Sequence, residues 1–213
     1  MSLKINEIYY SIQGESSYSG LPCVFVRLTY CNLRCSYCDT EYAFYEGEDL
    51  KIKDIIKKIN SYKCDLVEIT GGEPLLQKNY IKLIKELEKN GKKVLIETGG
   101  SLTIKNISKN THIILDLKCP SSNMEHKNLW DNLKYIKKTD EIKFVIGNKT
   151  DYDWSKKIIK ENDLENKCLL LMSPVYDKID KEKIINWILK DNLRVRFQIQ
   201  LHKEIWDKDK KGV

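Results

Sequence analysis

Residues 23–40 read CVFVRLTYCNLRCSYCDT, and they contain the two features that decide the fold and the chemistry. The run CVFVRLTY is apolar and rich in β-branched residues, as expected of a strand buried on both faces. The segment CNLRCSYC follows at once and has the spacing C-x3-C-x2-C. A strand that ends in a cysteine-bearing loop predicts a functional site at the carboxyl end of that strand.

Outward from this stretch, further strand-like runs alternate with amphipathic segments. In KIKDIIKKINSY (51–62), for example, isoleucines recur at helical spacing. Such βα alternation predicts an α/β fold with a mostly parallel sheet, open or partly closed into a (βα) barrel. With no linker and no internal repeat, 1–213 is expected to be a single domain. The expected strands are 23–30, 66–70, 93–98, 112–118, 142–146, 168–172 and 195–200, and the expected helices are 51–62, 79–90, 127–138, 151–162 and 180–191.

The composition argues against two classes of partner. The formal charge is +6, but the lysines are spread along the helical segments and form no focused basic stripe, so no nucleic-acid partner is expected. No apolar run approaches the roughly 18 residues that span a membrane, so no membrane partner is expected either. The N-terminal residues lack the apolar stretch of a signal peptide, and a cytoplasmic location is the default expectation.

The cysteine cluster favours an iron–sulfur site. Three thiolates on one tight loop can hold three corners of a [4Fe–4S] cluster, and no fourth cysteine stands nearby to bind the last iron. An iron left open is a place for a substrate or cofactor to coordinate. The alternatives are a zinc site, which usually needs a second ligand pair that the chain lacks, and a chance grouping. The expected cluster ligands are Cys31, Cys35 and Cys38, whereas Cys23, Cys64 and Cys168 are expected to be ordinary thiols in or beside strands.

The C-x3-C-x2-C spacing is the signature of the radical S-adenosylmethionine (SAM) superfamily, which the chain resembles along most of its length. The resemblance implies that the methionine moiety of SAM chelates the open iron. It also implies that TGGEP (70–74) contacts the amino end of SAM, since paired glycines let a backbone approach a ligand closely. The implied SAM-binding residues are Tyr37, whose backbone would lie near the adenine, the adjacent Cys38 and Asp39, Gly72 and Glu73 at the amino end, and Cys119, Pro120 and Ser121 at the ribose.

Three segments narrow the resemblance to the 7-carboxy-7-deazaguanine synthase family: YYSIQGES (9–16), FVRLTYCNLRCSYCDT (25–40) and QIQLHKEIW (198–206). The family implies conversion of 6-carboxy-5,6,7,8-tetrahydropterin to 7-carboxy-7-deazaguanine with loss of ammonia, a step of deazapurine (queuosine) biosynthesis. It further implies Mg²⁺, a homodimer and reduction by a flavodoxin or ferredoxin.

The same resemblance implies a set of substrate and metal contacts. The segment Ile12-Gln13-Gly14 would hold the pterin, Arg27 would bind its carboxylate, Thr70 would add a contact and Thr40 would bind Mg²⁺. A bidentate guanidinium suits a carboxylate, and a hydroxyl suits Mg²⁺. Plainer alternatives are a turn at 12–14, a solvent-facing arginine and a helix cap at Thr40.

The C-terminal end leaves one question open. Some family members end in a proline that meets the substrate, whereas this chain ends KGV, at 211–213. His202 and Lys203 could either close the site or lie on the surface.

Two other functions fit parts of the pattern. A glycyl-radical-enzyme activase would share the cluster and SAM but would act on a large protein through an exposed groove. A structural metal protein or electron-transfer protein would normally complete its site with a fourth ligand, which the cysteine pattern does not supply.

Overall fold

The computed structural model describes residues 1–213, and a single nine-stranded sheet runs through it. The strands are β1 (Ser2–Ile12), β2 (Pro22–Leu28), β3 (Glu48–Lys51), β4 (Leu66–Gly71), β5 (Lys93–Thr98), β6 (His112–Leu117), β7 (Glu141–Ile146), β8 (Leu169–Pro174) and β9 (Arg196–Phe197). Their order is β3-β1-β2-β4-β5-β6-β7-β8-β9. All neighbours from β2 to β9 are parallel, whereas β1 pairs antiparallel with β2 and with β3. The result is a mixed α/β fold with a mostly parallel sheet, a partial barrel of the radical SAM type.

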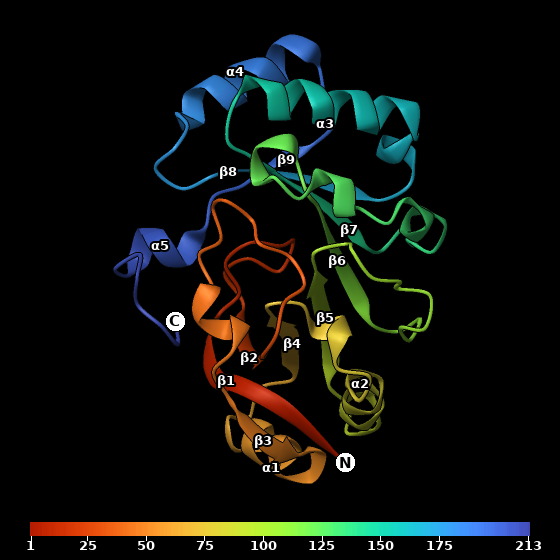
Figure 1. The fold of residues 1–213 in the computed structure, drawn as a ribbon, viewed down its shortest axis with the longest axis vertical. Coiled ribbons are helices and arrows are strands. Elements are labelled where there is room, and N and C mark those ends of the chain that lie inside the picture. The colour runs from red at the N-terminus through yellow and green to blue at the C-terminus, as the bar shows by residue number, and fades with distance from the viewer.

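The helices pack on the outside of this sheet. They are α1 (Ile52–Ser61), α2 (Tyr80–Lys89), α3 (Lys149–Glu161), α4 (Lys181–Asp191) and the short α5 (Leu201–Ile205). Figure 1 shows α3 and α4 side by side at one end of the molecule, α1 at the other end, and α5 near the C-terminus. None of the helices combines the length and the apolar character that a membrane crossing requires.

Most of the expected elements are present, and one expected helix is wrong. Every expected strand appears, although the last is only two residues long. The segment 127–138 forms short 3-10 turns instead of an α-helix. Its polar groups are engaged elsewhere: the Asn132 amide donates to the carbonyls of Gly100 and Leu102, and Leu129 N–H donates to the Gly100 carbonyl. The sequence prediction also omitted β1, β3 and α5.

The two faces of the central strands differ in character. Outward-facing residues such as Val67, Ile69 and Ile96 are buried among apolar side chains. The alternate, inward-facing positions include Glu68, Glu97, Asp116 and Lys143, all of which line the interior of the barrel. The nearly continuous apolar runs therefore conceal a polar inner face, since side chains alternate between the faces of a strand.

Candidate active site

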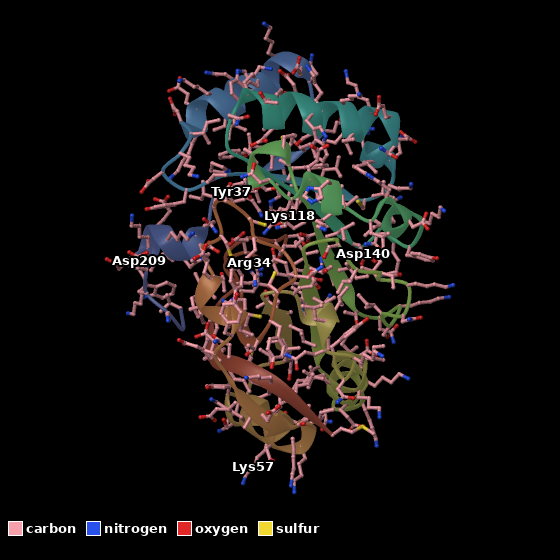
Figure 2. The ribbon with its side chains drawn as sticks, in the orientation of Figure 1. Arg34, Tyr37, Lys57, Lys118, Asp140 and Asp209 are labelled. Carbon is pink, nitrogen blue, oxygen red and sulfur yellow. The ribbon has the colours of Figure 1, made fainter.

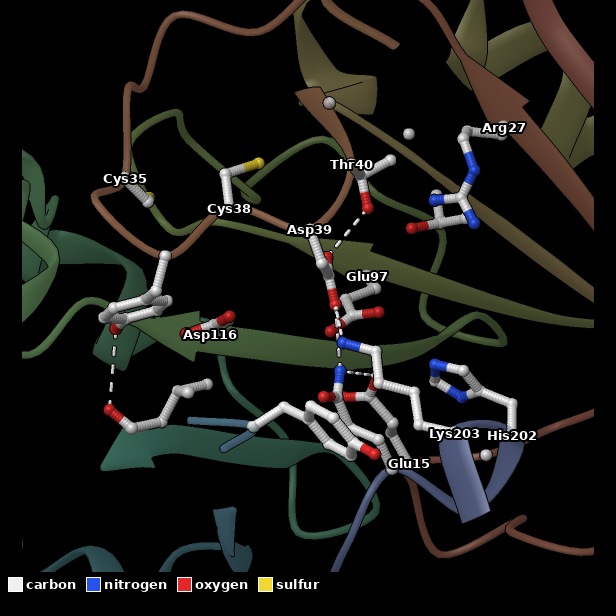
Figure 3. Close-up of a pocket in the computed structure, with 18 of the residues that line it drawn as sticks. Glu15, Arg27, Cys35, Cys38, Asp39, Thr40, Glu97, Asp116, His202 and Lys203 are labelled. Carbon is white, nitrogen blue, oxygen red and sulfur yellow. Dashed lines mark hydrogen bonds and ion pairs between the residues drawn. The ribbon is translucent and has the colours of Figure 1, made fainter. Parts of the chain in front are cut away.

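A cavity of about 740 Å³ opens at the carboxyl ends of the strands and extends into the barrel. Its wall combines the cysteine loop, inner-face residues of β2 and β4–β8, the segment 12–15 and C-terminal residues between 200 and 213. Figure 3 shows Cys35 and Cys38 on one side of this cavity and Arg27, Glu15 and His202 on the other. Segments far apart in the sequence therefore meet at one site.

The cysteine loop is tied firmly to the rest of the molecule. Ser36 N–H donates to the Ser122 carbonyl over 3.1 Å, and Ser36 Oγ donates to the Ser121 carbonyl over 2.6 Å. Arg34 donates to the carbonyls of Cys31 and Leu33, and its guanidinium lies 4.3 Å from the centre of the Phe44 ring. In Figure 2, Arg34, Tyr37 and Lys118 lie together near the middle of the molecule, far from Lys57 on α1.

The three loop thiols have the chemistry that a cluster requires. Cys31, Cys35 and Cys38 are free, half-buried and line the cavity. Burial raises the pKa of each thiol, so cluster assembly must displace their protons. No three His, Cys, Asp or Glu side chains are placed to hold one metal ion, whereas a four-iron cluster has ligands spread around its corners. Cys23, Cys64 and Cys168 do not line the cavity.

The TGGEP segment supports the cysteine loop directly. Glu73 N–H donates to the Tyr30 carbonyl over 2.7 Å, and Gly72 lies so close that an added Cβ would be 2.7 Å from Cys31 Cβ and closer still to the Tyr30 carbonyl oxygen. Gly72 also lines the cavity, as expected of a backbone that approaches SAM. A side chain at this position would therefore disturb the cysteine loop as well as the cavity wall.

The carboxylate of Glu73 is fully buried and does not line the cavity. It accepts hydrogen bonds from Leu75 N–H (3.0 Å), Thr98 Oγ1 (2.8 Å) and Gly99 N–H (2.8 Å). Its side chain therefore joins the end of β4 to the end of β5. Any contact between Glu73 and SAM would therefore be made by the Glu73 backbone.

Replacing Glu73 with glutamine should lower the free energy of unfolding by about 1–3 kcal/mol, because the new amide would turn an N–H group toward backbone N–H donors. Denaturant unfolding measures the loss. Glu88→Gln is the matched control: its partners are the hydroxyls of Ser108 and Thr111, which can rotate, and the expected change is within about 0.5 kcal/mol. Equal losses in both variants would contradict the assigned role of Glu73.

The expected ribose segment lies behind the cysteine loop. Cys119 is completely buried with its Sγ 3.4 Å from Ser155 Oγ, and Ser121 N–H donates to Asp151 over 2.8 Å. Neither these residues nor Pro120 lines the cavity. The ribose contact therefore stays a prediction, whereas Tyr37, Cys38 and Asp39 do line the cavity.

Arg27 points into the cavity, not toward solvent. Its Nε donates to Glu7 over 2.7 Å and its Nη2 to the Tyr9 hydroxyl over 2.9 Å. Burial would lower the pKa of the guanidinium, but Tyr9, Tyr42 and Glu7 raise it above its ordinary value. Arg27 is therefore a fixed cation with Nη1 left over for a ligand. Thr70 is its neighbour across β2 and β4 and also lines the cavity.

The segment 12–16 is folded by the side chain of Gln13. Its Oε1 accepts from Glu15 N–H (2.8 Å) and Ser16 N–H (2.9 Å), and its Nε2 donates to Glu68 Oε2 over 3.0 Å. Ile12, Gln13 and Gly14 all line the cavity. The Gln13 amide was expected to serve the pterin, but most of its hydrogen-bonding capacity is used within the protein.

Thr40 lies beside Asp39 at the cavity wall. The Thr40 hydroxyl donates to Asp39 Oδ1 over 2.9 Å, and Asp39 Oδ2 accepts from Lys203 Nζ over 2.6 Å (Figure 3). Thr40 precedes a short 3-10 helix, but its side chain does not cap it. Thr40 therefore stands at the N-cap position of this helix without a capping hydrogen bond from its hydroxyl. The neighbouring hydroxyl and carboxylate oxygens are of the type that Mg²⁺ prefers.

Lys143 is the centre of a buried charge cluster that sequence reasoning missed. It forms ion pairs with Glu15 (3.0 Å) and Glu97, and Asp116 lies 3.9 Å away. Burial disfavours the charged amine, but the surrounding carboxylates hold the pKa of Lys143 well above its ordinary value. The sequence did carry a signal of this cluster. The predicted strands 93–98, 112–118 and 142–146 each hold a charged residue among their apolar positions: Glu97, Asp116 and Lys143.

The C-terminal residues form part of the cavity wall. His202 and Lys203 line it, as do residues 208–213. Leu201 N–H donates to the Gly14 carbonyl over 3.1 Å, and His202 lies directly against Gly14, where an added Cβ would meet its ring. Of the two alternatives for His202 and Lys203, the structure shows the one in which they belong to the site.

Comparisons with known proteins agree with this geometry. A family model described as the radical SAM superfamily matches residues 26–188. Relatives named 7-carboxy-7-deazaguanine synthase from Koribacter versatilis and Chlorobaculum tepidum are 41% and 40% identical, over 99% of this chain and 100% and 97% of theirs. The crystal structure of QueE from Escherichia coli shares the fold, with a TM-score of 0.78 and 24% identity over 95% of each chain. The chain therefore belongs to the radical SAM superfamily and, within it, to the 7-carboxy-7-deazaguanine synthase family.

Proposed function

We propose that this protein converts 6-carboxy-5,6,7,8-tetrahydropterin to 7-carboxy-7-deazaguanine with loss of ammonia, in deazapurine (queuosine) biosynthesis. The observation that carries the proposal is the continuity of the cavity, which joins the loop of Cys31, Cys35 and Cys38 to the fixed cation of Arg27 inside the barrel. Membership of a family whose relatives bear this activity in their names supports it.

The cofactor half of the cavity fits a [4Fe–4S] cluster and SAM. Cys31, Cys35 and Cys38 would hold the cluster, and the backbone of Gly72 and the residues Tyr37 to Asp39 would line the SAM pocket. When bound, the cluster and SAM would supply the radical chemistry needed to remove a hydrogen atom from C6 of the pterin. The chain orients that carbon and excludes water from it.

The substrate half fits a small anion. Arg27 presents Nη1 to the substrate carboxylate, and Thr40, next to Asp39, would hold the Mg²⁺ that shares this carboxylate. Thr70 and the segment 12–14 supply the remaining wall. A fixed cation at Arg27 suits the carboxylate of a small substrate, which argues against a glycyl-radical-enzyme activase. The flavodoxin or ferredoxin reductant and the homodimer stay predictions.

An anaerobic turnover assay tests the proposal. The reconstituted protein, given a reductant, SAM, Mg²⁺ and 6-carboxytetrahydropterin, is expected to form 7-carboxy-7-deazaguanine and ammonia, detected by mass spectrometry and an ammonia assay. Omitting the pterin is the control for unproductive SAM cleavage. Reductive cleavage of SAM without any change in the pterin would refute the substrate assignment and leave the radical SAM chemistry intact.

A further inference from the structure

Glu68 occupies an unusual position in the barrel. It lies on the inner face of β4, two residues before Thr70, lines the cavity and is only 2% exposed. Its Oε2 accepts the hydrogen bond from Gln13, whereas its Oε1 makes no hydrogen bond within the protein. One oxygen of a deeply buried acid is therefore left for something that enters the cavity.

The other acids on the inner strand faces that line the cavity each form an ion pair with a lysine, although Asp116 Oδ1 is also left without a hydrogen bond. Glu97 binds Lys143, and Asp116 binds Lys118 over 2.7 Å. Glu68 has no cation within ion-pair distance, and burial together with the nearby Glu97 raises its pKa to about 8, so the carboxylate form of Glu68 is favoured only when further hydrogen bonds are donated to it. Because Glu68 lines the cavity and its Oε1 has no hydrogen-bond partner within the protein, a ligand that supplies hydrogen-bond donors would be favoured at Oε1.

The surroundings of Glu68 suit a flat heterocycle. Phe25 is its neighbour on β2, and the Phe25 ring stacks on Tyr9 with centroids 4.9 Å apart. Tyr9 and Phe25 line the cavity beside Glu68, and aromatic rings favour planar ligands packed against them. Glu68 thus offers a hydrogen-bond acceptor beside an aromatic surface.

We propose that Glu68 binds the 2-amino group of the pterin ring, an inference that rests on the proposed function. Arg27 and Thr70 form one level of the wall, where the substrate carboxylate would lie. Glu68 lies two residues deeper, about 6.6 Å along the strand. In a 6-carboxypterin the aminopyrimidine edge lies at the opposite end from the carboxylate. A substrate held at Arg27 by its carboxylate therefore extends its amino group to the level of Glu68.

The test compares two ligands that differ at position 2 and in the hydrogen that the 2-oxo form carries on the adjacent N1. These are 6-carboxytetrahydropterin and the corresponding tetrahydrolumazine, in which oxygen replaces the amino group. Anaerobic calorimetry on the SAM-loaded holoenzyme gives the ratio of their dissociation constants. The wild-type protein is expected to prefer the pterin by roughly tenfold or more, and Glu68→Val should bring the ratio close to one. Glu68→Gln keeps an acceptor and should retain part of the preference.

Gln13→Ala is the matched control. Like Glu68→Val, it removes the hydrogen bond between Gln13 and Glu68, but it leaves the Glu68 carboxylate in place to contact the ligand. It should weaken both ligands alike and preserve their ratio. An unchanged ratio in both Glu68 variants, or an equal loss of ratio in Gln13→Ala, would overturn the proposal. If the wild-type protein still converts the pterin, either of these results would overturn only the role of Glu68 and would leave the proposed function intact. A wild-type protein that neither binds nor converts the pterin would remove the proposed function and this inference together.

Discussion

Alanine at any one of positions 31, 35 or 38 is expected to reduce SAM cleavage to background. The three thiolates are the only cysteines that line the cavity, so no other thiol can replace a lost corner ligand. Anaerobic reconstitution of the wild-type chain should give about four irons and four sulfides per chain, and each variant should give substantially less. Iron and sulfide analysis and chromatography of 5′-deoxyadenosine measure the two effects.

The other cysteines provide matched controls for this experiment. Cys64→Ala and Cys168→Ala remove thiols outside the cavity and should keep full iron content and SAM cleavage. A cysteine variant of the loop that still cleaves SAM at the wild-type rate would contradict the assignment. So would wild-type protein that contains tetrahedral zinc and from which no cluster can be assembled.

Arg27→Lys should weaken binding of 6-carboxytetrahydropterin by tenfold to roughly a hundredfold and leave cluster content and SAM binding unchanged. Arg27 already donates from Nε to Glu7 and from Nη2 to Tyr9. Only a guanidinium can keep both of these hydrogen bonds and still offer further N–H groups to a carboxylate. The loss corresponds to about 1.5–3 kcal/mol for one charge-assisted hydrogen bond.

Magnesium gives this prediction a second readout. Mg²⁺ at Thr40 would share the substrate carboxylate, so activity of Arg27→Lys should depend more steeply on magnesium concentration than wild-type activity does. Arg194→Lys is the control, because Arg194 is exposed, pairs with Glu165 and lies outside the cavity. Wild-type affinity of Arg27→Lys at every magnesium concentration would require a different site for the carboxylate.

The sequence predicted the parallel part of the sheet well, because buried parallel strands are dense apolar runs that stand out between amphipathic helices. It missed β1, whose residues mix apolar and polar side chains beyond the parallel part of the sheet. It was wrong at 127–138, where Asn132 binds the loop around Gly100 and Leu102 and competes with helix formation. Tertiary hydrogen bonds of this kind leave no periodic pattern in the sequence.

The candidate site shows the same limit. The spacing of Cys31, Cys35 and Cys38 predicts the cluster loop, because ligand type and spacing are themselves properties of the sequence. The hydrogen-bond partners of individual polar groups cannot be read from the sequence. It therefore could not show that Gln13 folds its own loop or that Glu73 joins two strands. Likewise Lys143, Glu15 and Glu97 meet only after β5, β7 and the segment 12–15 come together.

The alternation along the inner strands has an evolutionary consequence. In β4, Val67 and Ile69 serve folding, whereas Glu68 and Thr70, interleaved with them, face the cavity. Substitutions at positions such as Glu68 and Thr70 can alter the chemistry of the site while the packed apolar side chains are kept. The chemistry of the site can therefore change without loss of the fold. A single-residue insertion or deletion in the strand would exchange the two sets and destroy stability and chemistry in one event. Length variation among descendants of this chain should therefore accumulate in loops and spare the strands.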